Sequence, residues 1–181
     1  MKQALLIIDV QRALFDAAPR PFEADAVVER INALSARARL AGVPVVFIQH
    51  EDGQSLVHDS EGWRLQARLV ARPADNFIRK RTADSFLGTP LGELLTARNI
   101  GQVVVAGYAS EFCVDTTARR AAALGFAVVI AADAHTTHDK PHASAALIRA
   151  HHNATLADIS SFGPRIEAVP GDRIHFGDGA V

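Results

Sequence analysis

Short runs of apolar residues alternate along this chain with segments in which apolar residues recur at helical spacing. Each run is bounded by polar or turn-forming residues, a pattern typical of strands that are buried on both faces of a sheet. The predicted strands are residues 4–8, 45–48, 76–81, 102–106, 126–131 and 154–159.

The segments between these runs predict helices. The first begins near residue 25 and stops at Gly42, and a second begins at Thr89-Pro90, where Thr89 acts as a cap and Pro90 occupies the first turn. Two more are predicted at residues 113–124 and 142–151, with room for a short one at 63–69 in an otherwise irregular stretch.

Strands that alternate with helices in this way indicate an α/β protein in which helices cover both faces of a parallel sheet. Neither repeats nor a linker of biased composition interrupt the pattern. We therefore expect residues 1–181 to form a single domain.

Composition narrows the classes of partner. The 19 Lys and Arg residues nearly balance the 20 Asp and Glu residues, for a net charge of −1. A binder of nucleic acid or of an anionic membrane needs a basic face, so neither partner is expected. The longest apolar run, residues 126–132, is too short to span a bilayer, and residues 4–8 are too short for a signal peptide. We expect a cytoplasmic protein whose partner is a small-molecule substrate.

Two residue types are scarce, and their positions suggest chemistry. Cys113 is the single cysteine, and Lys80 is one of only three lysines. Ligands of open α/β sheets bind at the carboxyl ends of strands. Asp9 follows the first predicted strand, Lys80 ends the third, and Cys113 follows the fourth.

Each of these residues also has a purely structural interpretation. A lone cysteine is most often a small buried apolar residue, and Asp9 could simply cap a turn. In an extended segment, however, Lys80 points away from the side of Arg79 and Arg81, so it need not share their solvated face. Cys113 begins a predicted helix, where the free N–H groups favour a thiolate. A shared Asp, Lys and Cys site is therefore one of two interpretations.

Several segments match, in order, the isochorismatase-like cysteine hydrolase superfamily, which includes nicotinamidases and N-carbamoylsarcosine amidohydrolases. The segments are Ile8-Asp9-Val10-Gln11 with Phe15, Lys80 with Ser85-Phe86, Val103 to Gly107 followed by Cys113-Val114, Thr117 and Arg119, and Gly125 with Val128 and Asp133-Ala134-His135. The resemblance extends from residue 4 to about residue 160. Ser110 departs from the pattern, which more often has Thr, but it keeps the hydroxyl.

The resemblance implies a three-layer α/β/α, doubly wound, mostly parallel six-stranded sheet of Rossmann-like architecture. It assigns Cys113 as the nucleophile, Asp9 as the acid and base, and Lys80 as the third member of a catalytic triad. It also implies a cis peptide bond between Tyr108 and Ala109. The backbone N–H groups of Ala109 and Cys113 would then form the oxyanion hole. Members of the superfamily commonly assemble as dimers or tetramers, so a homo-oligomer is expected.

Three aromatic residues are candidates for substrate binding. Phe15 and Tyr108 flank the expected site and could form its apolar walls. Trp63, the only tryptophan, lies in the irregular stretch 49–75 and either anchors that loop or lines the substrate pocket.

No cofactor is expected, and the histidines do not form a convincing metal site. His135, His138 and His142 have suggestive spacing, but Pro141 interrupts a continuous helix through them. Nicotinamidases carry an Asp-x-His metal motif, whereas the order here is Gln49-His50-Glu51-Asp52. We therefore predict that no metal is required.

The leading interpretation is hydrolysis of a C–N bond in a small amide or carbamoyl compound through a Cys113 thioester. One alternative is an isochorismatase-type hydrolase of a vinyl ether, a reaction that needs no thiolate. Another is a catalytically silent interaction or thiol-sensing protein with the same fold. A dinucleotide-dependent oxidoreductase is disfavoured because no Gly-x-Gly-x-x-Gly motif follows the first strand.

Overall fold

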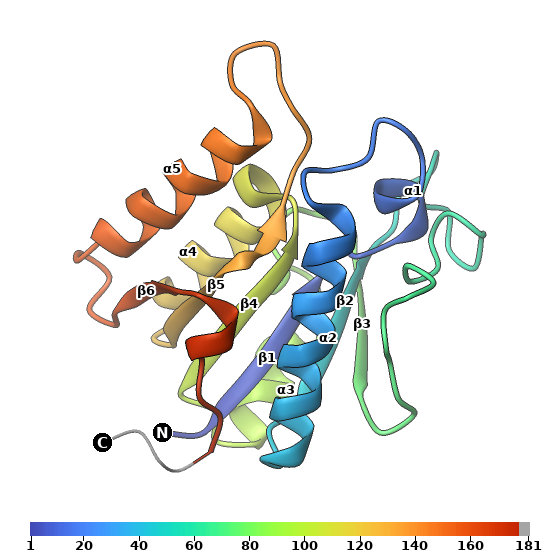
Figure 1. Ribbon diagram of the computed structural model, residues 1–181. Coiled ribbons are helices and arrows are strands. Elements are labelled where there is room, and N and C mark those ends of the chain that lie inside the picture. The colour runs from blue at the N-terminus through green and yellow to red at the C-terminus, as the bar shows by residue number, and fades with distance from the viewer. Residues whose placement is uncertain (178–181) are drawn as a thin grey trace.

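The computed structural model describes residues 1–177, which form a six-stranded sheet between two layers of helices (Figure 1). The strands run in the order β3-β2-β1-β4-β5-β6, and every neighbouring pair is parallel. Their bounds are β1 Gln3–Ile8, β2 Val45–His50, β3 Asn76–Lys80, β4 Gln102–Tyr108, β5 Ala127–Thr136 and β6 Ile166–Val169. The predicted parallel α/β fold with three layers is confirmed.

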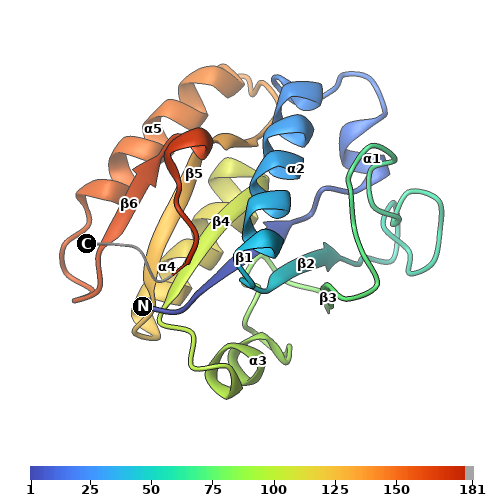
Figure 2. The ribbon, with the colours of Figure 1, turned by 60° about the horizontal axis from the view of Figure 1, so that its bottom comes forward.

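Different helices cover the two faces of the sheet (Figures 1 and 2). The long helix α2 packs on one face, and α3, α4 and α5 pack on the other. The helices are α1 Arg12–Phe15, α2 Ala24–Leu40, α3 Leu91–Ala97, α4 Asp115–Ala123 and α5 Ala145–Asp158, with a π-helical turn at Ser110–Val114 and a short 3-10 turn at Gly171–Arg173.

The central strands are buried on both sides, which explains their continuous apolar runs. Along β1, Leu5 and Ile7 pack against the α2 layer, whereas Leu6 and Ile8 face the layer of α3, α4 and α5. All four side chains are at most 1% exposed. Alternate residues of one strand therefore contribute to two separate cores.

The direction of winding reverses between β1 and β4, which lie side by side in the middle of the sheet. The chain leaves β1 toward α2 on one face of the sheet and leaves β4 toward α4 on the other, and Asp9 and Cys113 follow these two strand ends. Gly107 permits the close approach of the two strands, because a Cβ at this position would lie only 2.1 Å from the carbonyl oxygen of Ile8. Its φ of +119° is also unfavourable for other residues.

The predicted sixth strand at 154–159 is wrong. These residues belong almost entirely to α5, in which Leu156 is buried while Ala154 and Ala157 are exposed. A short apolar run does not distinguish a strand from a helix by its periodicity. The actual sixth strand, β6, has a single buried residue, Ile166, so the sequence contains no buried apolar run that would predict it.

Three helix predictions also need correction. The segment predicted as one helix over 113–124 divides into the π-helical turn and α4. The last helix starts at Ala145 rather than 142, because Ser144 caps it by accepting a hydrogen bond from the Leu147 N–H. No helix forms at 63–69, where turns and an isolated bridge between Gln11 and Leu65 occupy the segment.

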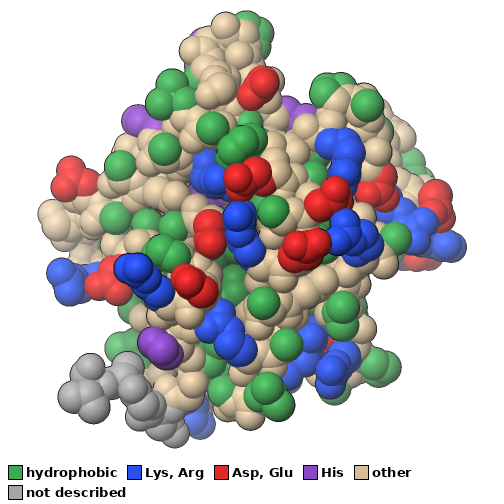
Figure 3. Space-filling view, in the orientation of Figure 1, with side chains coloured by type: hydrophobic (Ala, Val, Ile, Leu, Met, Phe, Trp, Pro, Cys, Tyr) green, Lys and Arg blue, Asp and Glu red, His purple; other side chains and the backbone are tan. Residues whose placement is uncertain are grey.

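Charged side chains of both signs are interspersed on the face that carries α2 (Figure 3). This mixture agrees with the nearly balanced composition. Within residues 1–177, none of the helices combines the length and the apolar character that crossing a membrane requires.

Candidate active site

Lys80 lies at the centre of a cluster at the carboxyl ends of β1, β2 and β3. Its Nζ is 2.8 Å from Asp9 Oδ2 and 3.1 Å from Cys113 Sγ. It also lies 3.1 Å from the carbonyl oxygen of Thr82 and 3.3 Å from His50 Nδ1. An ammonium group has three hydrogens to donate, so these four acceptors compete for them. The structure thus brings the three predicted site residues together.

The inward orientation of Lys80 follows from the alternation of side chains along β3. Lys80 is 2% exposed, whereas the side chains of Arg79 and Arg81 are 51% and 80% exposed. The predicted separation of Lys80 from its basic neighbours is confirmed. Because the ammonium and the Asp9 carboxylate are both buried, each depends on the other for charge compensation.

Asp9 combines an uncommon backbone conformation with an unsatisfied oxygen. It has a φ of 53°, in the left-handed region that Asp adopts more readily than most residues. Its N–H donates to the carbonyl oxygen of Ile48, which ties it to β2. Oδ2 accepts from Lys80, but Oδ1 is buried and has no hydrogen-bond partner among residues 1–177. Oδ1 is therefore a free acceptor inside the site.

Cys113 lies in the π-helical turn and is partly exposed. The carbonyl oxygen of Ala109 accepts from the N–H groups of both Phe112 and Val114, which folds the turn around Cys113. The peptide bond between Tyr108 and Ala109 is cis, as the resemblance implies. Burial and, to a lesser degree, the Asp9 carboxylate raise the pKa of Cys113 to about 12, although Lys80 opposes the shift. The resting sulfur is a thiol.

His50 is a member of the cluster that sequence reasoning considered only as a poor match to a metal motif. Its Nδ1 faces Lys80, and burial together with the Lys80 charge lowers the pKa of His50, which keeps the imidazole neutral. The fully buried Gln11 fixes the backbone here: it accepts from the His50 N–H and donates to the carbonyl oxygens of His50 and Trp63. In the sequence, the signal for this role of Gln11 was its position two residues after Asp9.

The aromatic candidates Phe15 and Tyr108 are in contact, with ring centroids 5.9 Å apart in an edge-to-face arrangement. Phe15 has no exposed surface, whereas Tyr108 is half-buried. The Tyr108 hydroxyl is 2.8 Å from His138 Nδ1. Tyr108 is therefore the better placed of the two to meet a substrate, and both assignments stay predictions.

Trp63 lies within the loop that joins β2 to β3. Its carbonyl oxygen accepts from Gln11 and Gln49, and its ring packs against His58 at 4.7 Å. His58 and His50 help to line a hollow of about 500 Å³ that adjoins Lys80 through His50. Trp63 thus anchors the loop, and its contact with substrate stays a prediction.

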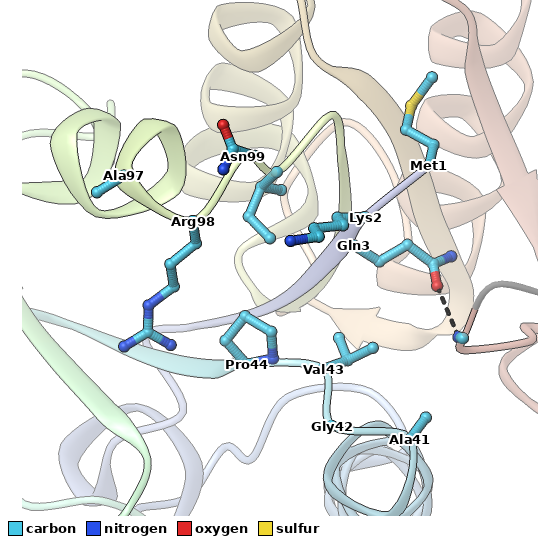
Figure 4. Close-up of a pocket in the computed structure, with 12 residues that line it drawn as sticks. Met1, Lys2, Gln3, Ala41, Gly42, Val43, Pro44, Ala97, Arg98 and Asn99 are labelled. Atoms are coloured by element: carbon cyan, nitrogen blue, oxygen red, sulfur yellow. Dashed lines mark hydrogen bonds between the residues drawn. The ribbon is translucent and has the colours of Figure 1, made fainter.

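Another hollow, of about 480 Å³, lies at the amino ends of β1, β2 and β4 (Figure 4). Met1, Lys2 and Pro44 line it, and Gln3 accepts a hydrogen bond there from the N–H of Gly177. It is at the opposite end of the sheet from Asp9. A site at that end would lie away from the carboxyl ends of the strands, where ligands of open α/β sheets bind.

Two members of the histidine series are engaged in other contacts. His135 is fully buried between Ser110 and Asn153, and His138 bonds Tyr108 and the carbonyl oxygen of Pro19. The absence of a metal requirement stays a prediction.

The isochorismatase domain model matches residues 3–161 of the chain. The chain is 38% and 40% identical to two streptothricin hydrolase sequences of Streptomyces noursei, over 93% and 78% of its own length. It spans only 64% and 57% of those sequences. It is 34% identical to the isochorismatase family protein YecD of Escherichia coli O157:H7, over 92% of this chain and 90% of YecD.

One solved structure of an isochorismatase family protein superposes with a TM-score of 0.85 at 35% identity. That match covers 92% of this chain and 97% of the other. The family model, the sequence relatives and the fold agree, and the resemblance of the motifs is confirmed. The chain belongs to the isochorismatase family.

Proposed function

We propose that the protein is a cysteine hydrolase that cleaves a C–N bond of a small amide or carbamoyl compound. The observation that carries this proposal is the position of Lys80, within 3.1 Å of both the Cys113 sulfur and the Asp9 carboxylate. A buried acid, a buried cation and a thiol in mutual contact are the groups that covalent acyl transfer needs.

In the first half of the reaction, Asp9 takes the proton of Cys113 as the sulfur attacks the carbonyl carbon of the substrate. The unpartnered Oδ1 of Asp9 is the acceptor available for this proton. A thiol whose pKa is about 12 needs such a base, since little thiolate exists before the substrate arrives. Lys80 compensates the charge of the carboxylate and of the sulfur as the proton moves.

The carbonyl oxygen becomes negatively charged in the tetrahedral intermediate, and the backbone N–H groups of Ala109 and Cys113 stabilise it. Loss of one such donor typically costs about 3 kcal/mol of transition-state stabilisation. The intermediate collapses when the C–N bond breaks and the amine leaves with the proton held by Asp9. An acyl thioester then remains on Cys113.

In the second half, Asp9 accepts a proton from water, and the oxygen of that water attacks the thioester carbon. The carbon–sulfur bond breaks, the acid product departs, and the sulfur regains its proton. Asp9 thus acts as base, acid and base again within one turnover. The reaction consumes one water and uses no cofactor.

The names of the streptothricin hydrolases support hydrolysis as the reaction type. Because the chain spans less than two thirds of those sequences, streptothricin is a test compound rather than an assigned substrate. We propose that a small-molecule substrate enters beside Tyr108 and Trp63. We also propose that the protein is a homo-oligomer.

Turnover assays test this proposal. Wild-type protein and the variant Cys113→Ala are incubated with streptothricin and with a panel of small amides and carbamoyl compounds, and amine release is measured. We expect release by the wild type and none by the variant. Release by both proteins would contradict covalent catalysis by Cys113. No release by either protein from any compound would favour the alternatives, a hydrolase of a vinyl ether or a silent protein.

A further inference from the structure

A buried chain of hydrogen bonds runs behind the turn that carries Cys113. Ser110 Oγ is 2.8 Å from His135 Nδ1, and His135 Nε2 is 2.8 Å from Asn153 Oδ1. Asn153 Nδ2 donates to the carbonyl oxygen of Ala132 at 2.8 Å. Ser110 and His135 are fully buried. The chain joins the π-helical turn to β5 and α5, three segments that are separate in the sequence.

The direction of each hydrogen bond in this chain is determined by its end. Because Asn153 uses its amide nitrogen on Ala132, its oxygen faces His135 and can only accept. The proton of the imidazole is therefore on Nε2, and Nδ1 accepts from the Ser110 hydroxyl. Burial lowers the pKa of His135 to about 4, so the imidazole is neutral near pH 7.

Ser110 is placed where its tether controls the turn. It is the first residue of the π-helical turn, it follows Ala109 directly, and it precedes Cys113 by three residues. Its side chain is fully buried and is out of reach of a substrate, so it is not a second nucleophile. The hydroxyl anchors the start of the turn to β5 through His135.

We infer that Ser110, His135 and Asn153 are positioning residues, which hold the N–H groups of Ala109 and Cys113 in the orientation that stabilises the oxyanion. This inference rests on the proposed function, because an oxyanion forms only if Cys113 attacks a carbonyl. It assigns a task to a histidine that the triad does not use. It also explains why Ser, which keeps the hydroxyl, is accepted at a position where Thr is more usual.

Two reactions of Cys113 separate the positioning of the oxyanion hole from the general integrity of the site. With para-nitrophenyl acetate, the sulfur bonds to the acetyl carbon, para-nitrophenolate leaves and Asp9 takes the thiol proton, so the reaction passes through an oxyanion. With iodoacetamide, the sulfur displaces iodide from a saturated carbon and no oxyanion forms. Both rates are measured at one pH for each variant.

For Ser110→Ala we expect the acetylation rate to fall by about a factor of 10 to 100, as for a small misplacement of catalytic groups. The rate with iodoacetamide should stay at the wild-type value. Ser110→Thr keeps the hydroxyl and should restore acetylation. Ser35→Ala, which removes another fully buried hydroxyl in α2, is the matched control and should leave both rates unchanged.

Asn153→Ala is the second variant, since Asn153 is only half-buried and lies in α5 rather than in the sheet. It should show the same selective loss of acetylation. Acetylation at the wild-type rate in Ser110→Ala or Asn153→Ala, or equal losses in both reactions, would overturn the positioning role. Failure of the wild type to acetylate at all would instead contradict the proposed function itself.

Discussion

Lys80 Nζ lies 2.8 Å from Asp9 Oδ2, and neither side chain is more than 2% exposed. A buried ion pair carries a desolvation cost, because both charges lose water. Removal of one member leaves the other charge buried without compensation. This pair joins the ends of β1 and β3 on either side of β2. It therefore couples the stability of the sheet edge to the chemistry of the site.

Replacement of Lys80 by Met tests this coupling. The change leaves the Asp9 carboxylate buried without a cation, and we expect the free energy of unfolding to fall by about 3 to 5 kcal/mol. The double variant Lys80→Met, Asp9→Asn, which removes both charges, should recover part of that loss. Urea unfolding of the two variants and the wild type gives the comparison. A double variant less stable than Lys80→Met would show that the pair is not compensating charge.

His50 should influence turnover through Lys80. His50→Ala removes the acceptor at 3.3 Å from Nζ and frees the ammonium to shift, so we expect kcat to fall by about a factor of 10. His58→Ala is the matched control, because His58 lines the same hollow and contacts Arg79 and Trp63 but not Lys80. Equal effects of the two substitutions on kcat would assign His50 to the hollow alone.

The buried imidazole of His135 predicts a specific loss of stability in acid. Its pKa is about 4 in the folded protein against an ordinary value of 6.5, so the unfolded chain binds a proton more readily. The contribution of the neutral His135 to the free energy of unfolding is complete above pH 6.5 and is lost as the pH falls toward 4. His135→Gln should flatten the dependence of unfolding free energy on pH in this window. An unchanged slope would show that His135 does not titrate in this way.

Gly107 should tolerate no side chain. In Gly107→Ala the Cβ would meet the carbonyl oxygen of Ile8 at 2.1 Å, and β1 and β4 would have to separate where Asp9 leaves the sheet. We expect a loss of about 3 kcal/mol or more in stability. In Gly42→Ala the Cβ has no atom within 4 Å, so only the positive φ costs stability, about 1 to 2 kcal/mol. Similar Tm values for the two variants would contradict the close approach.

The sequence pattern predicted the parts of this fold that depend on complete burial. Strands β1, β2 and β4 are continuous apolar runs because both faces are covered, and the alternation along β3 placed Lys80 inside. Strand β6 escaped prediction because it lies at the edge of the sheet and is mostly half-exposed. Its place was wrongly given to residues 154–159, whose pattern is equally compatible with a helix.

The candidate site shows the same division between local pattern and distant contact. The catalytic roles came only from the family resemblance, but the proximity of Asp9, Lys80 and Cys113 was predictable because each follows or ends a strand, and parallel strands bring their carboxyl ends together. The link between His135 and Asn153 was not, since it depends on how α5 packs over β5. His50 was visible only as a departure from a metal motif, and its contact with Lys80 required the positions of two strands.

Intact-protein mass spectrometry on rapidly quenched mixtures with a hydrolysable amide tests the covalent role of Cys113 most directly. We expect a transient mass increase equal to the acyl group of the substrate, located on Cys113 by peptide mapping and absent from Cys113→Ala. The adduct should form and decay at rates that match turnover. Turnover of the same amide by Cys113→Ala, or turnover by the wild type without an adduct on Cys113 at any quench time, would contradict the covalent role of Cys113.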